Sequence, residues 1–262
     1  MSSSPSNIKK KAAHRYREGA GYLSYFMKPM TTDPVRLVIF AQGRTGSTLL
    51  ESLLCSTRHF RRNGELLKAR HGEIMHPIQY ILGRSKIKAH ENFIFHVKIN
   101  QLTEDRKRPV DPVAFLETLC ENGWRVIYLR RANKVRHALS NIVAQQRGRY
   151  HKYNDNKEEL KVHVNCEELV RRVEDRFRRE KAEREVLANI KYHEVVYEED
   201  LEEPASHQKT VDRVLNFVSL ESRVASTWLE KINTQSLEDL IVNYDEFVAQ
   251  LRKREWLKFL EE

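Results

Sequence analysis

Apolar positions along the chain alternate between short β-branched runs and longer stretches with helical spacing. Four short runs predict strands because they are rich in strand-favouring residues and bounded by polar residues, proline or glycine. They lie at 35–41, 93–97, 125–129 and 192–197. The first run, from Val35 to Ala41, is almost continuously apolar, which is typical of a strand buried on both faces of a parallel sheet.

Apolar residues spaced three and four apart predict helices between and after these runs. The predicted helices cover 47–54, 112–121, 134–146, 167–187, 211–218, 237–242 and 246–260. Because strands and helices alternate, we expect an α/β fold of three layers, with a central, mainly parallel sheet flanked by helices.

The length of 262 residues, with 40% hydrophobic and 32% charged residues, favours one globular domain. We expect this domain to cover 31–262 and to follow a basic arm over 1–30 that is flexible over 1–20. No apolar run has the length of a membrane span, and the first residues are too polar for a secretory signal. A cytoplasmic protein is therefore expected, with Cys55, Cys120 and Cys166 as reduced thiols.

The net charge of +9 is compatible with nucleic acid, an acidic membrane surface or an anionic small ligand as the partner. Much of the charge is diffuse, because basic and acidic residues alternate over 171–184 and the arm carries another group of lysines and arginines. Charge alone therefore does not decide between these partners.

The strongest local signal follows the first predicted strand and reads Gly43-Arg44-Thr45-Gly46-Ser47-Thr48. It joins a buried strand to a helix start, where free backbone N–H groups and the helix dipole bind anions. The glycines let the backbone curl around a phosphate, while the hydroxyls and Arg44 add donors and positive charge. It is not a Walker A motif, because Ser47 stands where that motif has lysine. These residues alone are compatible with either a phosphate-binding site or an ordinary glycine turn.

A second signal follows the strand at 125–129. Arg130 and Arg131 come directly after it, Asn133 is a favourable helix N-cap, and Ser140 lies seven residues further on. Arg131 would lie at the carboxyl end of the strand, where open α/β sheets bind ligands, and Ser140 falls on nearly the same helix face as Asn133. The pair can grip one anion, although a solvated basic helix start explains the same residues.

Taken in this order, the two motifs resemble the PAPS-dependent sulfotransferases, and most closely the bacterial carbohydrate branch with the nodulation and trehalose sulfotransferases. Four further segments resemble that branch, namely Asn63–Leu67, Val97–Asn100, Tyr197–Leu201 and Leu237–Glu246. The resemblance covers roughly 33–250 and implies a P-loop-like fold. Two features depart from it. Many sulfotransferases carry lysine in place of Arg44, and the spacing from Arg131 to Ser140 is one residue longer than in other branches.

The resemblance implies that both motifs bind 3′-phosphoadenosine 5′-phosphosulfate (PAPS), the sulfuryl donor. The first loop would hold the 5′-phosphosulfate, with Arg44 on the leaving phosphate, and Arg131 with Ser140 would hold the 3′-phosphate. Arg130 could share or take the role of Arg131. The expected cofactor-binding residues are Gly43, Arg44, Thr45, Gly46, Ser47, Thr48, Arg130, Arg131, Ser140 and Lys231. No metal is expected, because no acidic or His/Cys cluster suggests one.

An alcohol is a poor nucleophile, so a general base is expected opposite the donor. The resemblance points to Glu65, and His59, His71 and His96 are alternatives because histidine titrates near neutrality. Lys98, at the end of a strand, would stabilise the transferring group or form a strand-end salt bridge. The expected catalytic residues are Arg44, Glu65 and Lys98.

These assignments predict transfer of a sulfuryl group to a hydroxyl of a carbohydrate or small natural product, or to an amine or carbamoyl nitrogen. Acceptor contacts are expected on variable loops, at 67–85 and 146–164. A magnesium-dependent, P-loop-like phosphotransferase is the first alternative, disfavoured by the missing Walker lysine. A nucleic-acid-binding module ranks below it, because only Tyr150 and Tyr153 interleave with basic residues. A small-molecule acceptor is thus the expected partner, while the oligomeric state is not predicted.

Overall fold

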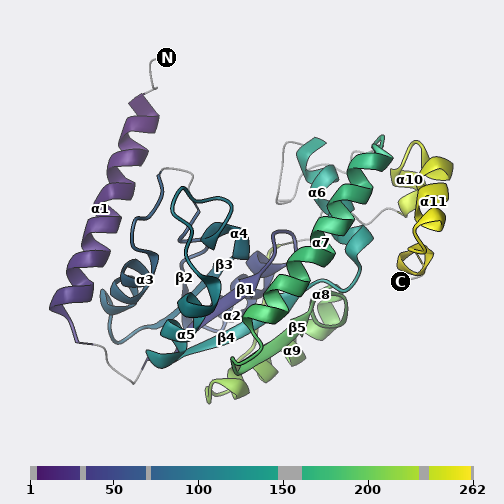
Figure 1. The fold of residues 1–262 in the computed structure, drawn as a ribbon. Coiled ribbons are helices and arrows are strands. Elements are labelled where there is room, and N and C mark those ends of the chain that lie inside the picture. Colours follow the sequence, from purple (N-terminus) through teal and green to yellow (C-terminus); the bar gives the residue numbers. More distant parts are fainter. Residues whose placement is uncertain (1–4, 30–33, 69–71, 147–160, 230–235, 261–262) are drawn as a thin grey trace.

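The computed structural model describes residues 5–29, 34–68, 72–146, 161–229 and 236–260 (Figure 1). Its centre is a sheet of five parallel strands in the order β2-β3-β1-β4-β5. The strands are β1 (Arg36–Ala41), β2 (Phe60–Arg62), β3 (Asn92–Val97), β4 (Trp124–Arg130) and β5 (Tyr192–Val196). The predicted α/β class and parallel sheet are confirmed. β2 was not predicted, because three residues with two exposed arginines carry no periodic signal.

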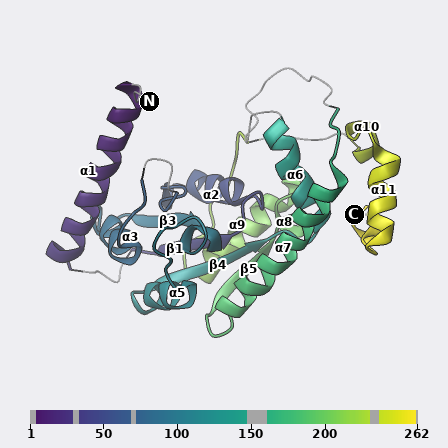
Figure 2. The same ribbon diagram turned by 45° about the horizontal axis from the view of Figure 1, so that its top comes forward.

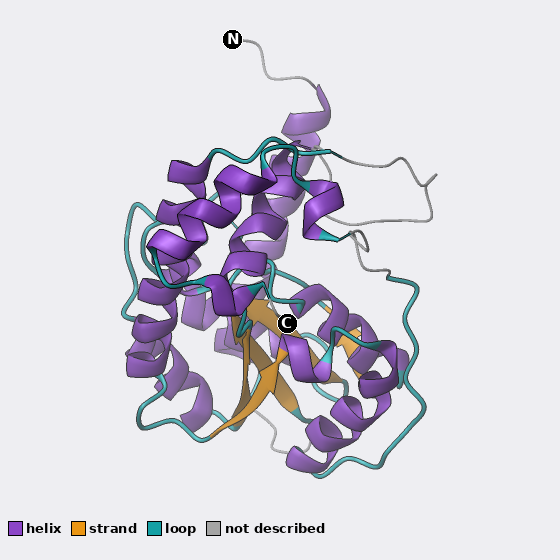
Figure 3. Ribbon diagram, turned by 90° about the vertical axis from the view of Figure 1, so that its right-hand side faces the viewer, coloured by secondary structure: helices purple, strands orange, loops and turns teal. Residues whose placement is uncertain are grey.

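Helices cover both faces of the sheet, as Figure 3 shows, because side chains of β1 alternate between two apolar cores. Val38 and Phe40 pack with α3 (Pro77–Lys86), α5 (Pro112–Glu121) and the C-terminal end of α7 (Cys166–Val186). Leu37 and Ile39 pack on the opposite face, with α2 (Ser47–Ser56) and α9 (Pro204–Phe217). The three-layer architecture is thus confirmed.

A third apolar cluster lies beyond the carboxyl end of the sheet. It joins α6 (Lys134–Gln146) and the first half of α7 to the C-terminal elements. These are α10 (Leu237–Leu240), α11 (Tyr244–Lys253) and the 3₁₀ helix η1 (Leu257–Phe259), so the helix predicted over 246–260 is divided in two. In Figures 1 and 2, α10 and α11 lie at the end of the molecule farthest from α1 (Pro5–Met27).

The prediction of a flexible segment over 1–20 is wrong from Pro5 onward, because α1 is a 23-residue helix that packs along α3. The two helices cross at a pair of glycines. A Cβ added to Gly83 would overlap the carbonyl group of Gly21. Beside the crossing, the rings of Tyr22 and Tyr80 meet edge to face at 6.4 Å. Across the described ranges, no helix combines the length and apolar composition needed to cross a bilayer.

Candidate active site

β1 lies at the centre of the sheet, at the point where the chain changes direction. From β1 the chain passes through α2 to the edge strand β2, returns to β3 beside β1, and then places β4 on the other side. Ligands of open α/β sheets bind outside the carboxyl ends of the strands at such a point. The predicted motif Gly43–Thr48 follows β1 at this position.

The loop after β1 requires left-handed backbone at two positions. Gly46, with φ of 93°, is the N-cap of α2, and Arg44 has φ of 72°. A Cβ on Gly46 would lie 2.8 Å from Cδ2 of Tyr197, so only glycine fits against this ring. The buried Thr45 closes the loop by donating its hydroxyl hydrogen bond to the carbonyl of Gln42, at 2.8 Å.

The start of α2 presents a row of backbone donors. The first backbone hydrogen bond of the helix joins the Leu50 amide to the Gly46 carbonyl, at 2.9 Å. Among the described residues, no carbonyl or side chain accepts from the amides of residues 45–49. The hydroxyls of Ser47 and Thr48 stand at the same helix end. The loop therefore offers converging N–H and O–H groups to a phosphate or a similar anion.

The two predicted phosphate-binding segments meet in the structure. Arg44 donates to Oγ of Ser140 from both Nε and Nη2, at 3.3 Å each. The loop after β1 and the second turn of α6 are therefore parts of one site, although 96 residues separate these two side chains.

His137 provides a second link between α6 and the loop, which the sequence did not reveal. Its Nε2 lies 2.7 Å from the carbonyl oxygen of Gly43. Burial, helped by the nearby Arg176 and Arg131, holds the pKa of His137 well below its usual range, so the ring is neutral. A carbonyl only accepts, so Nε2 carries the proton and donates. His137 thus anchors the loop and does not act as a proton carrier.

Arg131 lies beside the loop but does not contact Ser140. Its Nε donates to Glu198 at 3.2 Å, and its guanidinium lies 4.5 Å from the centre of the Tyr197 ring. The same ring covers Gly46, so Tyr197 connects Arg131 to the loop. Glu198 also accepts from the amides of residues 132 and 133, at the start of α6. Arg131 and Ser140 thus both lie next to the loop, Ser140 through Arg44 and Arg131 through Tyr197, and their predicted shared hold on a phosphate stays a prediction.

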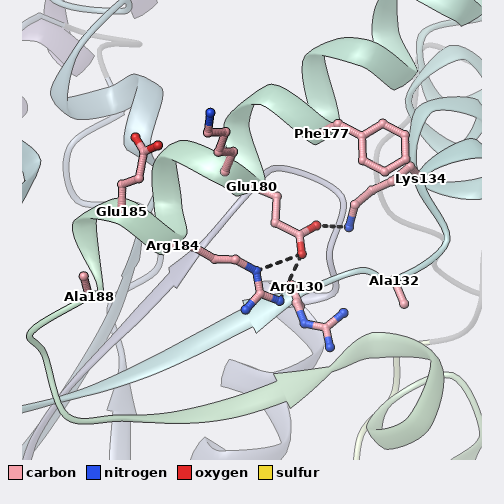
Figure 4. Close-up of a pocket in the computed structure, with 9 residues that line it drawn as sticks. Arg130, Ala132, Lys134, Phe177, Glu180, Arg184, Glu185 and Ala188 are labelled. Atoms are coloured by element: carbon pink, nitrogen blue, oxygen red, sulfur yellow. Dashed lines mark hydrogen bonds and ion pairs between the residues drawn. The ribbon is translucent and has the colours of Figure 1, made fainter.

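Arg130 points to the other face of β4. It donates to Glu194 at 2.8 Å and lines a hollow between β4, α6 and α7 (Figure 4). In this hollow Glu180 pairs with both Lys134 and Arg184. Arg130 itself is engaged by Glu194. Arg131 is therefore better placed than Arg130 for a ligand of the loop. Lys231 lies outside the described residues.

Glu65 and Lys98 form an ion pair at the edge of the same site. Nζ of Lys98 lies 3.0 Å from Oε1 of Glu65, and Gln101 donates to Oε2 at 2.8 Å. A Cβ added to Gly43 would lie 3.5 Å from Nζ of Lys98, so this pair adjoins the loop. The structure thus brings the predicted base, the predicted strand-end lysine and the predicted phosphate-binding loop together.

The Glu65 carboxylate is stabilised in its charged form. Burial by itself raises its pKa, but Lys98, His96 and Lys68 outweigh this effect, and the pKa lies below the ordinary value. Glu65 is therefore ionised at neutral pH. A carboxylate has about four lone-pair positions, so it can accept a further proton donor while keeping its two partners.

Glu51 of α2 fixes the turn that carries Glu65, and sequence analysis missed it. The side chain is fully buried and accepts from the amides of Asn63 and Gly64, at 3.1 and 2.7 Å. His96 lies 3.5 Å from its other oxygen. Asn63 and Gly64 were predicted only through the resemblance. The signal that could have identified Glu51 is a charged residue on the apolar face of a helix.

Two histidines considered as alternative bases have other partners. Nε2 of His59 lies 2.9 Å from the carbonyl of Glu221, and His96 faces the buried Glu51. His71 lies outside the described residues, as do 147–160 of the predicted acceptor loops. Within 67–85, α3 buries Tyr80, Ile81 and Leu82 in the core, so this part of that segment has a structural role.

Glu183 of α7 is a buried carboxyl group next to the loop. Its Oε2 accepts from Nε2 of Gln42 at 3.0 Å and from the hydroxyl of Tyr128 at 3.2 Å. Burial raises its pKa to about 7, against the lowering effect of these hydrogen bonds. Gln42 directly precedes Gly43, so the protonation state of Glu183 affects the hydrogen bond that holds the residue before the loop.

The described part of the chain contains no group of three or more His, Cys, Asp or Glu side chains arranged to hold a metal ion. Comparison with known proteins adds no relative: no protein-family model matches the chain, and no curated protein matches it either. The resemblance to sulfotransferases therefore remains a prediction from the motifs and from the site that they form.

Proposed function

We propose that this protein is a PAPS-dependent sulfotransferase acting on a carbohydrate or another small molecule. The observation that carries the proposal is the contact between Arg44 and Ser140, which joins the two predicted phosphate-binding segments into one site. A donor with phosphates on the 3′ and 5′ positions of its ribose needs two phosphate-binding segments close together. The proposal is further supported by Glu65 and Lys98, which stand beside the loop.

The residues of this site fit a bisphosphorylated nucleotide. The amides at the start of α2, which have no acceptor among the described residues, suit the 5′-phosphosulfate together with Arg44 and the hydroxyls of Ser47 and Thr48. Ser140 and Arg131 suit the 3′-phosphate, at the start of α6. Arg131 is preferred to Arg130 because it shares Tyr197 with Gly46, whereas Arg130 faces the hollow toward α7.

PAPS, when bound, supplies an activated sulfuryl group. In the proposed reaction the acceptor oxygen forms a bond to sulfur, the bond from sulfur to the bridging phosphate oxygen breaks, and the products are a sulfate ester and 3′,5′-bisphosphoadenosine (PAP). Arg44 would stabilise the negative charge that develops on the leaving phosphate. Glu65 would take the acceptor proton, because it is ionised at neutral pH and adjoins the loop.

Lys98 has two roles in this proposal. It keeps Glu65 charged before the reaction, through the 3.0 Å ion pair. Once Glu65 has taken a proton, that ion pair weakens and the ammonium group becomes available to the transferring sulfuryl group. Lys98 would thus form the predicted salt bridge before the reaction and contact the sulfuryl group during it.

The acceptor group remains a hydroxyl or a nitrogen of a small molecule. The cytoplasm is the proposed location, a choice supported by the absence of pairing among the three cysteines. Burial also raises the pKa of Cys55 to about 12, so this thiol stays protonated and is unsuited to act as a nucleophile.

The test is a transfer assay with PAPS labelled in the sulfuryl group and a panel of sugars, glycosides, aminoglycosides and small natural products. The proposal predicts a labelled acceptor and stoichiometric PAP with wild-type protein, and neither with Arg44→Ala. Magnesium-dependent phosphate transfer from ATP, without sulfuryl transfer, would contradict it and favour a phosphotransferase.

A further inference from the structure

Helix α7 crosses the carboxyl edge of the sheet beside the β1 loop (Figure 1). Its sequence contains several arginines. Most of them are matched by carboxylates at 2.5–3.2 Å. These pairs are Arg172 with Glu168, Arg178 and Arg179 with Asp175, Arg179 with Glu104, and Arg184 with Glu180. Arg176 differs from these four.

Arg176 is half-buried and has no carboxylate within ion-pairing distance among the described residues. Its Nη1 makes one long hydrogen bond, 3.4 Å to Oε1 of Gln42, and its Nε is buried with no hydrogen-bond partner in the part of the chain that the structure describes. The neighbouring Asp175 is already engaged by two other arginines. Glu183, the other carboxyl group that influences Arg176 electrostatically, accepts hydrogen bonds from Gln42 and Tyr128.

The position of Arg176 places it at the base of the anion-binding loop. Gln42, its hydrogen-bond partner, directly precedes Gly43, and His137, which donates to the Gly43 carbonyl, is close enough for Arg176 to lower its pKa. Burial lowers the pKa of Arg176 itself to about 10, so it remains a cation at neutral pH. A partly buried cation without a counter-charge destabilises the protein, and a bound anion would remove that cost.

We propose that Arg176 is an anion-binding residue of the Gly43–Thr48 site and contributes its guanidinium to a phosphate or sulfate group of the ligand. The inference rests on the proposed function and adds a third arginine to it, besides Arg44 and Arg131. The anionic group is either a phosphate of PAP or a sulfate-like group bound beside PAP. The second group would be the transferring sulfuryl group or part of an anionic acceptor.

Two calorimetric titrations separate these sources. The first measures the affinity for PAP, and the second measures the affinity for inorganic sulfate with PAP at saturation. Each is made with wild type, Arg176→Gln, Arg176→Lys and the control Arg178→Gln, whose side chain is 71% exposed on the same helix. Urea unfolding of each variant reports on stability.

We expect Arg176→Gln to lose about 10- to 100-fold in one of the two affinities, the usual effect of a charged hydrogen bond. Loss in the first titration assigns Arg176 to the nucleotide, and loss in the second assigns it to the sulfate side. Arg176→Lys should recover part of the lost affinity, and Arg178→Gln should match wild type. Arg176→Gln should also be at least as stable as wild type, because it removes an unmatched cation.

Equal affinities of wild type and Arg176→Gln in both titrations would overturn the inference and leave the proposed function intact. A loss as large in Arg176→Lys as in Arg176→Gln, accompanied by lower stability, would also overturn it, because packing would then explain the loss. If wild type does not bind PAP, the proposed function fails and sulfate is titrated without PAP; dependence of that sulfate binding on Arg176 would still support the inference. Binding of neither probe overturns both.

Discussion

Arg44 donates two hydrogen bonds to the Ser140 hydroxyl, and this contact closes the site between the β1 loop and α6. Arg44 has left-handed backbone geometry, which is uncommon for a residue with a Cβ, so the surrounding loop holds it in place. Ser140 is already bonded to the arginine that would contact the leaving group. The two residues are therefore expected to act together in binding a nucleotide.

Replacing Arg44 should have the largest effect on turnover. Arg44→Ala removes the charge that stabilises the leaving phosphate, so we expect kcat/KM for PAPS to fall by at least about 100-fold. Ser140→Ala should weaken PAP binding by only about 3- to 10-fold, because a neutral hydroxyl is lost. Steady-state kinetics with labelled PAPS measures both effects. Near-normal turnover of Arg44→Ala would show that the loop is not part of the active site.

Arg131 should affect nucleotide affinity more than rate. Arg131→Ala removes the cation next to Tyr197 and Glu198, and we expect PAP affinity to fall by about 10- to 100-fold with a much smaller change in kcat. Arg130→Ala is the matched variant on the other face of β4 and should change affinity little. The opposite order of effects would assign the 3′-phosphate to Arg130.

Glu65→Gln should lower kcat by about 100-fold or more while leaving PAP affinity within a few fold of wild type. The pKa of Glu65 is lowered by its cationic neighbours, so its ion pair with Lys98 stabilises the fold above the ordinary carboxyl pKa and is lost as pH falls through the lowered value. The stability difference between wild type and Glu65→Gln should therefore shrink below about pH 4.5. An unchanged kcat would assign the base to another residue.

Glu183 should make stability depend on pH near neutrality, in the opposite sense. Its pKa is raised from 4.5 to about 7, so the folded state holds a proton that the unfolded state releases. The resulting destabilisation is absent below pH 4.5, grows as pH rises to 7, and is complete above it. Glu183→Gln should thus be more stable than wild type at pH 8, by up to about 3 kcal/mol. Urea unfolding at pH 5 and pH 8 measures this; the same difference at both would contradict it.

The crossing of α1 and α3 should tolerate no side chain at Gly83. Gly83→Ala places a Cβ against the backbone of Gly21, so we expect α1 to detach and become sensitive to limited proteolysis. Gly19→Ala is the control, because a Cβ there meets nothing within 4 Å, and alanine favours the helix. Equal protease resistance of both variants would show that the helices do not pack as described.

The central strands and most helices could be predicted from sequence because their apolar patterns are strong. The apolar runs at 93–97 and 125–129 predicted the ends of β3 and β4 to within one residue. The helices predicted over 112–121 and 134–146 have the same bounds as α5 and α6. The N-terminal helix could not be predicted in this way. Its lysines and arginines resembled a solvated arm, and its packing depends on two glycines that lie 62 residues apart.

The predicted site residues were found by motif, but their partners were not. His137 and Arg176 act through residues far away in sequence, so no local pattern marks them. Glu51 is marked only by its charge on the apolar face of a helix. Arg131 and Ser140 were expected to hold one phosphate because both follow β4. In the structure Glu198, from the segment after β5, also binds Arg131 and the start of α6, which no motif predicted. Such contacts between distant segments are visible only once the sheet is assembled.

The most direct test of the account is isothermal titration of the wild-type protein with PAP, repeated with Arg44→Ala and Ser140→Ala. We predict one PAP per chain in the wild type, weaker binding in Ser140→Ala and weaker still in Arg44→Ala. Absence of PAP binding by correctly folded wild-type protein, or binding that neither substitution changes, would contradict the claim that these two segments grip a single bisphosphorylated nucleotide.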